Sequence, residues 1–105
     1  MPLYELRTYT LQVGKMQQAV ELYNTMAVPV VERYRDNLVG YFLGDVGAMN
    51  QIIHIWRYED DAARRDFWAR LYAEPEFQAF VGKFRPLVIS QENKLMFNAP
   101  WGPTP

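Results

Sequence analysis

The sequence predicts an α+β fold of the ferredoxin-like type, with its elements in the order βαββαβ. Two observations predict it. Along the chain, the apolar residues alternate between the two-residue repeat of strands and the repeat of about 3.6 residues of helices. In addition, two strand-like segments near the middle are joined by a turn. We therefore expect a four-stranded antiparallel sheet with helices on one face. The length of 105 residues suits a single domain, placed at 1–98, followed by a proline-rich tail at 99–105.

The first half of the chain predicts one strand and one long helix. Residues 3–11 are rich in β-branched and aromatic side chains, which is typical of a strand. From Lys15 to Tyr34 the apolar residues recur with helical spacing. Pro29 lies inside this pattern, and proline in a helix interior removes a hydrogen bond at a cost of about 3 kcal/mol. We therefore expect a kink or a break near Val28.

The middle of the chain predicts a hairpin formed by residues 38–46 and 51–58, with its turn at 47–50. Side chains alternate between the two faces of a strand, so His54, Trp56 and Tyr58 share one face. A turn of two or four residues would set Tyr41 opposite Trp56, whereas an odd number would reverse the faces.

The second half predicts two helical segments and a last strand. Asp60 or Asp61 is suited to cap a helix over residues 62–72. Pro75 is suited to the first turn of the next helical segment, which continues to Phe84. Residues 87–97 then have the composition of a strand.

Both faces of the predicted sheet carry apolar or aromatic side chains, yet the helices can cover only one of them. An uncovered aromatic face is unusual for a monomer, so we expect two copies to pair face to face around a shared cavity. We predict that the uncovered face is the one that carries the residues Arg7, Tyr9, Tyr41, His54, Trp56 and Tyr58.

Composition excludes several classes of function. The formal net charge of −1 gives no long-range attraction to nucleic acid. No apolar run approaches the roughly 20 residues of a membrane-spanning helix, so we expect no membrane insertion. There is no cysteine, which excludes disulfides and thiolate chemistry. The single histidine and scattered acids indicate no metal site and no cofactor. We expect a cytoplasmic protein.

His54 and Arg7 are the candidate catalytic residues. His54 is the only side chain with an unperturbed pKa near neutrality, and so could carry a proton. Arg7 could clamp a carboxylate or enolate. The residues predicted to line the pocket around them are Glu5, Tyr9, Tyr41, Trp56 and Tyr58. The alternative is a structural histidine whose ring nitrogens are satisfied by Glu5, Glu92 or a backbone carbonyl.

Several segments resemble members of the NIPSNAP family. The opening Tyr-Glu-Leu-Arg-Thr-Tyr-Thr-Leu at residues 4–11 is similar to the start of the family's domain, and the resemblance continues through 13–15, 39–42, 47–58 and 87–92. Only Ala48-Met49 in the turn departs mildly from the family pattern. The resemblance implies a homodimeric α+β barrel. The wider superfamily of this barrel includes cofactor-independent monooxygenases, haem-degrading enzymes and small isomerases.

Three functions stay open on the sequence. The first is an enzyme with acid–base or cofactor-independent oxidative chemistry on a small organic, anionic molecule. The second is a ligand-binding module without catalysis. The third is a protein-interaction module that uses its helix surface or the Trp101 tail.

Overall fold

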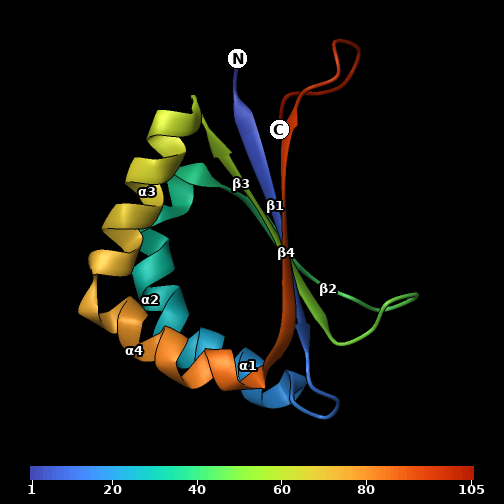
Figure 1. Ribbon diagram of the computed structural model, residues 1–105, viewed down its shortest axis with the longest axis vertical. Helices are drawn as coiled ribbons and strands as arrows, with labels where there is room; N and C mark the ends of the chain where they lie inside the picture. Colours follow the sequence, from blue (N-terminus) through green and yellow to red (C-terminus); the bar gives the residue numbers. More distant parts are fainter.

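Four antiparallel strands form one sheet, as the sequence predicted, and their order in it is β2-β3-β1-β4. The computed structural model describes all residues from Met1 to Pro105. Figure 1 shows the sheet nearly edge-on, with every helix on one side of it. The strands are β1 (Leu3–Leu11), β2 (Leu38–Leu43), β3 (Gln51–Tyr58) and β4 (Val88–Phe97).

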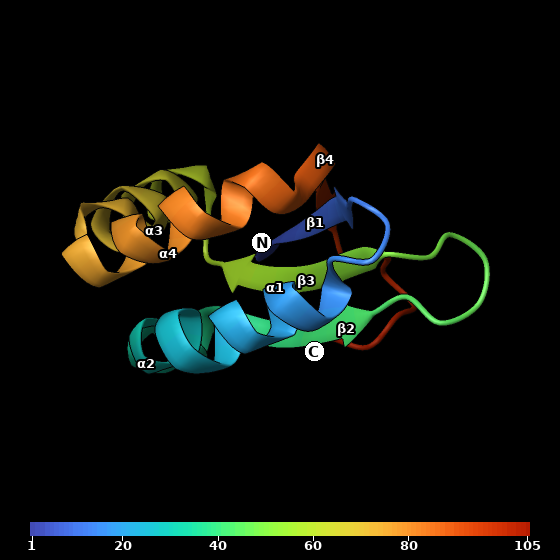
Figure 2. The ribbon, with the colours of Figure 1, turned by 90° about the horizontal axis from the view of Figure 1, so that it is seen from below.

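The helices form two rows that lie side by side over the sheet (Figure 2). No helix is both long enough and apolar enough to cross a membrane. The first row contains α1 (Met16–Leu22), a π-helical turn (Tyr23–Ala27), α2 (Val28–Val31) and a 3₁₀ segment (Glu32–Asn37). The second row contains α3 (Asp61–Ala73), α4 (Pro75–Phe84) and a short 3₁₀ turn (Arg85–Leu87).

The predicted break at Pro29 takes the form of the π-helical turn. The Val28 N–H bonds to the Tyr23 carbonyl, five residues back, which widens the helix just before the proline. A wider turn accommodates the proline ring, which would otherwise clash with the carbonyl of Thr25. The helical row therefore changes direction over the sheet.

Asp60 is the residue that caps α3. Its Oδ1 accepts a hydrogen bond of 2.7 Å from the Ala63 N–H, which satisfies one of the free donors at the helix start. Asp61 instead pairs with Arg64 and Arg65 at 2.9 and 2.8 Å. Pro75 opens α4 as predicted.

The hairpin register differs from the prediction. Tyr41 lies opposite His54, not Trp56, because β2 ends at Leu43 and the connection to β3 is longer than expected. The Gly44 N–H bonds to the Gln51 carbonyl at 3.0 Å and closes this loop. The register has moved by an even number of residues, so Tyr41 still shares a face with His54.

The helices cover the aromatic face of the sheet, whereas the sequence predicted that this face would be left open. Phe67 of α3 packs on Trp56 and Tyr58, with ring centroids 4.9 and 5.3 Å apart. Phe84 of α4 packs on Tyr9 at 5.6 Å. The prediction was therefore wrong about which face is covered. The residues concerned are Arg7, Tyr9, Tyr41, His54, Trp56 and Tyr58.

The physical reason is that the residue pattern of β3 does not indicate which face of the sheet the helices cover. Ile53 and Ile55 alternate with His54 and Trp56, and both sets are compatible with burial. Long aromatic side chains can fill the thick layer between a sheet and its helices, and Trp56 is fully buried there. The predicted lining thus lies inside one chain and not in a chamber between two sheets.

The C-terminal tail folds back toward the face that the helices leave open. The Tyr4 hydroxyl donates to the Pro105 carbonyl at 3.1 Å, and the Asn98 side chain donates to the Pro103 carbonyl at 2.6 Å. Tyr4 is consequently buried, while Trp101 at the tip of the tail is 89% exposed.

Candidate functional site

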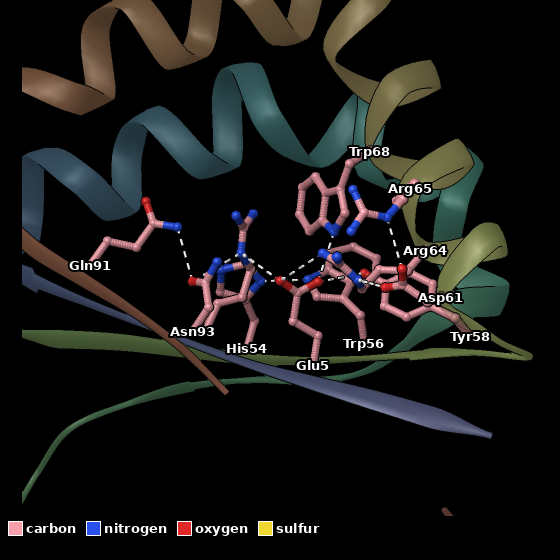
Figure 3. Close-up of polar contacts among 11 residues, drawn as sticks. Glu5, His54, Trp56, Tyr58, Asp61, Arg64, Arg65, Trp68, Gln91 and Asn93 are labelled. Atoms are coloured by element: carbon pink, nitrogen blue, oxygen red, sulfur yellow. Dashed lines mark hydrogen bonds and ion pairs between the residues drawn. The ribbon is translucent and has the colours of Figure 1, made fainter. Parts of the chain in front are cut away.

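A buried carboxylate lies at the centre of a polar cluster between β1 and α3 (Figure 3). Glu5 is 1% exposed, and its Oε1 accepts hydrogen bonds from Trp68 Nε1 at 2.8 Å and from the Tyr58 hydroxyl at 3.1 Å. Its Oε2 lies 3.5 Å from Arg7 Nε and 3.9 Å from Arg64 Nη1. The donors come from two strands and a helix, so the cluster ties the helical layer to the sheet.

Arg7 is held on three sides. Its guanidinium lies over the Trp68 ring, 4.0 Å from the centroid, in a cation–π contact. Its Nε also approaches Asn93 Oδ1 at 3.4 Å, and that oxygen accepts a further bond from Gln91 at 3.0 Å. The Arg7 Nη1 atom is buried and has no hydrogen-bond partner.

His54 is stacked between two tyrosine rings. The centroid of Tyr41 is 4.6 Å away on β2, and that of Tyr9 is 5.2 Å away on β1. The Trp56 Nε1–H donates to His54 Nδ1 at 2.6 Å. Indole nitrogen can only donate, so Nδ1 is the acceptor and the proton of the neutral ring is on Nε2. Nε2 is buried and, like Arg7 Nη1, has no partner.

Burial, together with the smaller effect of the nearby Arg7 charge, lowers the pKa of His54 to about 3. The ring is therefore neutral at pH 7 and presents a hydrogen-bond donor. Burial also raises the pKa values of Tyr9 and Tyr41, so both hydroxyls stay protonated at pH 7.

The opposite charges of the cluster occur in pairs. Glu5 faces Arg7, and Arg64 lies closer to Asp61, at 2.9 Å, than to Glu5, at 3.9 Å, while His54 is neutral. A buried donor without an acceptor is costly, and two such donors are found here. The arrangement suits a group that brings oxygen acceptors, and the charge of Arg7 favours an anionic one.

The cluster lies next to β4, which is an edge strand of the sheet. Arg7 keeps 10% of its side chain exposed, whereas the Glu5 side chain keeps 1%. Gln91, Asn93 and Leu95, which lie beside β1 on the helix-facing side, are all exposed. A small molecule could thus approach Arg7 from the β4 edge.

The structure brings together every residue that the sequence placed at the site, although beneath the helices of one chain. Neither Glu5 nor Glu92 partners the His54 ring, which bonds instead to Trp56. Sequence reasoning missed Arg64, Trp68 and Asn93. A signal for two of them was present, because Arg64, Trp68 and Tyr72 follow helical spacing beside the buried Phe67 and Leu71 of α3.

Two further features complete the description of possible sites. No group of three or more histidine, aspartate or glutamate side chains lies close enough to hold a metal ion. A separate groove of about 610 Å³ runs between the first helical row and β2, with walls that include Val20, Val28, Leu38 and Tyr41.

These features define a ferredoxin-like α+β protein with a polar site enclosed between its sheet and its helices. A family model described as NIPSNAP matches residues 4–103. The chain therefore belongs to the NIPSNAP family, which confirms the resemblance seen in the sequence.

Comparison with individual proteins agrees with this assignment. Human protein NipSnap homolog 3A is 31% identical over 100 residues, which are 93% of this chain and 40% of that protein. This chain thus spans about two-fifths of the length of that relative. The crystal structure of Atu4242 from Agrobacterium tumefaciens is 34% identical, with a TM-score of 0.89 over 96% of this chain and 97% of that one. An antibiotic biosynthesis monooxygenase, 18% identical over 93% of this chain and 99% of its own, shares the fold with a TM-score of 0.64.

Proposed function

We propose that this protein binds a small organic anion at Arg7 and His54. The observation that carries the proposal is the pair of buried donors without acceptors, Arg7 Nη1 and His54 Nε2. The two residues lie directly opposite each other on β1 and β3, on the same face of the sheet. An anionic oxygen between them would satisfy both donors.

Each residue has a distinct role in this proposal. Arg7 clamps the anion, and Glu5, Trp68 and Asn93 hold its guanidinium in place. His54 donates a hydrogen bond from Nε2. A bound anion would raise the pKa of His54, since a neighbouring negative charge favours the imidazolium form. Proton transfer by His54 would therefore depend on the ligand. Acid–base or cofactor-independent oxidative chemistry at this site stays a prediction.

Replacing Arg7 with glutamine is expected to weaken binding of a flat organic anion, such as benzoate, by about tenfold to a hundredfold. The reason is the loss of hydrogen bonds from a charged donor, worth about 1.5 to 3 kcal/mol. Isothermal titration calorimetry measures the effect. Arg70→Gln is the matched control, because Arg70 is exposed and pairs with Asp66 on the outside of α3. Equal affinities for benzoate in both variants would refute the assignment of the clamp.

We also propose that the chain forms a homodimer through the sheet face that the helices leave open. Leu6 faces Ile55 and Thr8 faces Ile53 at the centre of that face. Phe42, which lies beside Ile53, is 53% exposed. This stripe of apolar side chains crosses three strands, and a second copy would remove it from water.

Ile55→Glu is expected to convert the dimer to a monomer, because the substitution places a charge at the centre of the proposed interface. Light scattering on a dilute sample measures the mass. Val46→Glu adds the same charge to the β2–β3 loop, where Val46 is 91% exposed, and should leave the dimer intact. A wild-type protein that scatters as a single copy would contradict the proposal.

The alternative function is a protein-interaction module, and the exposed Trp101 is the observation that favours it. We rank this function second, because a single exposed side chain on the tail defines no surface. The cytoplasmic location stays a prediction.

A further inference from the structure

We infer that the anion is a carboxylate with an apolar chain. Its carboxylate would lie at Arg7, and its chain would lie along the helix-facing side of β4, over Leu95 and Phe97. This inference rests on the proposed function, because the same arginine supplies the anchor.

The strand register places the residues that would bind the carboxylate and those that would bind the apolar chain in one row. Asn93 lies opposite Arg7 on the β1–β4 ladder, Leu95 lies opposite Glu5, and Phe97 lies opposite Leu3. Alternate residues of a strand share a face, so these β4 side chains form one row on the side of Arg7. The row from Asn93 to Phe97 is about 13 Å long, at about 3.3 Å per residue.

Exposure and polarity favour this direction for the chain. Leu95 is 48% exposed and Phe97 is 65% exposed, although both lie on the face that the helices cover elsewhere. In the opposite direction the next side chain on this face is Gln91, which is polar. A chain that runs from Arg7 along β4 therefore gains apolar contacts at once toward Phe97, whereas in the other direction it first meets Gln91.

Charge decides which chemistry the head group has. The donor without an acceptor, Arg7 Nη1, belongs to a charged group, and a carboxylate is a stronger acceptor for it than a neutral head group. The larger groove beside β2 is a weaker candidate for the same ligand. None of its polar side-chain atoms is both buried and without a partner, so nothing there demands an anion.

Calorimetric titration with acetate, hexanoate and decanoate tests the inference on the full chain. Affinity is expected to rise by about twofold to fourfold per methylene group, since a buried methylene is worth up to about 0.8 kcal/mol. Decanol, which has the chain but not the charge, should bind at least tenfold more weakly than decanoate. Decanol that binds as tightly as decanoate would overturn the inference.

Paired variants test where the apolar chain of the ligand lies. The double variant Leu95→Ser, Phe97→Ser is expected to bind decanoate at least tenfold more weakly and acetate with unchanged affinity. Ile89→Ser is the matched control, because Ile89 is 64% exposed on the same strand, on the other side of Asn93. It should leave both affinities unchanged.

The outcomes separate this inference from the proposed function. If acetate and decanoate bind equally and Arg7→Gln weakens both, the anion site stands and the apolar chain is refuted. If no carboxylate binds, both proposals fail. If the double variant turns a dimer into a monomer, a second copy covers Leu95 and Phe97, and the inference is overturned.

Discussion

Replacing Glu5 with leucine is expected to lower the free energy of unfolding by about 3 to 5 kcal/mol. Glu5 is 1% exposed and accepts hydrogen bonds from Trp68 and Tyr58. Leucine removes these acceptors and also the negative charge beside Arg7. A buried guanidinium would then lack its partner, and two buried donors would lack acceptors. Urea unfolding followed by tryptophan fluorescence measures the loss.

Two comparisons make this result specific. Glu92→Leu is the matched control, because Glu92 is exposed on β4, and its effect should stay within about 0.5 kcal/mol. The double variant Glu5→Leu, Arg7→Met should lose less free energy of unfolding than the two single variants lose in sum. The reason is that Arg7→Met removes the charge that Glu5→Leu leaves unpaired. Strict additivity would show that Glu5 and Arg7 do not act as a pair.

Much of the fold could be predicted because its elements carry local signals. The change from period two to helical spacing located each strand and helix, and Pro29 located the break before α2. The hairpin register could not be derived with the same certainty. The turn composition near Gly47 fits loops of several lengths, and only the pairing of Gly44 with Gln51 fixes which one forms.

The covered face of the sheet could not be predicted, because both sides of β3 are apolar. The choice depends on which side chains fill the layer beneath the helices, and that is a property of packing in three dimensions. Phe67 meets Trp56 across this layer at 4.9 Å, although the two are separated by a turn and a helix start in the sequence. The sequence nevertheless placed Arg7 and His54 together, because they share a face whichever side is covered.

The side chains that contact Glu5, Arg7 and His54 could not be predicted from the sequence. Trp68 contributes both a hydrogen bond to Glu5 and a ring beneath the Arg7 guanidinium, yet it lies on a helix far along the chain. Likewise, the pairing of Trp56 Nε1 with His54 Nδ1 fixes the tautomer of the histidine. Such contacts decide that Nε2 is the donor nitrogen of His54 at neutral pH, whereas residue type alone leaves the tautomer open.

Acidification from pH 7.5 to pH 4.5 is expected to cost the wild-type protein about 2 to 3 kcal/mol of stability through His54 alone. The pKa of His54 falls from 6.5 to about 3 on folding, mainly because burial disfavours the charged ring. Between these values the unfolded chain binds a proton that the folded chain does not. This stability is therefore complete above pH 6.5 and is lost as the pH falls toward 3.

His54→Gln isolates this effect, because glutamine does not titrate and its carbonyl oxygen can accept the hydrogen bond from Trp56. The measurement is the free energy of unfolding of both proteins across that pH range. Carboxylates titrate equally in the two, so the difference between them reports His54. The free energy of unfolding of the wild type minus that of the variant should decrease by about 2 to 3 kcal/mol as the pH falls. Parallel curves would mean that the ring is open to solvent, and the donor that we assign to the anion site would not be held there.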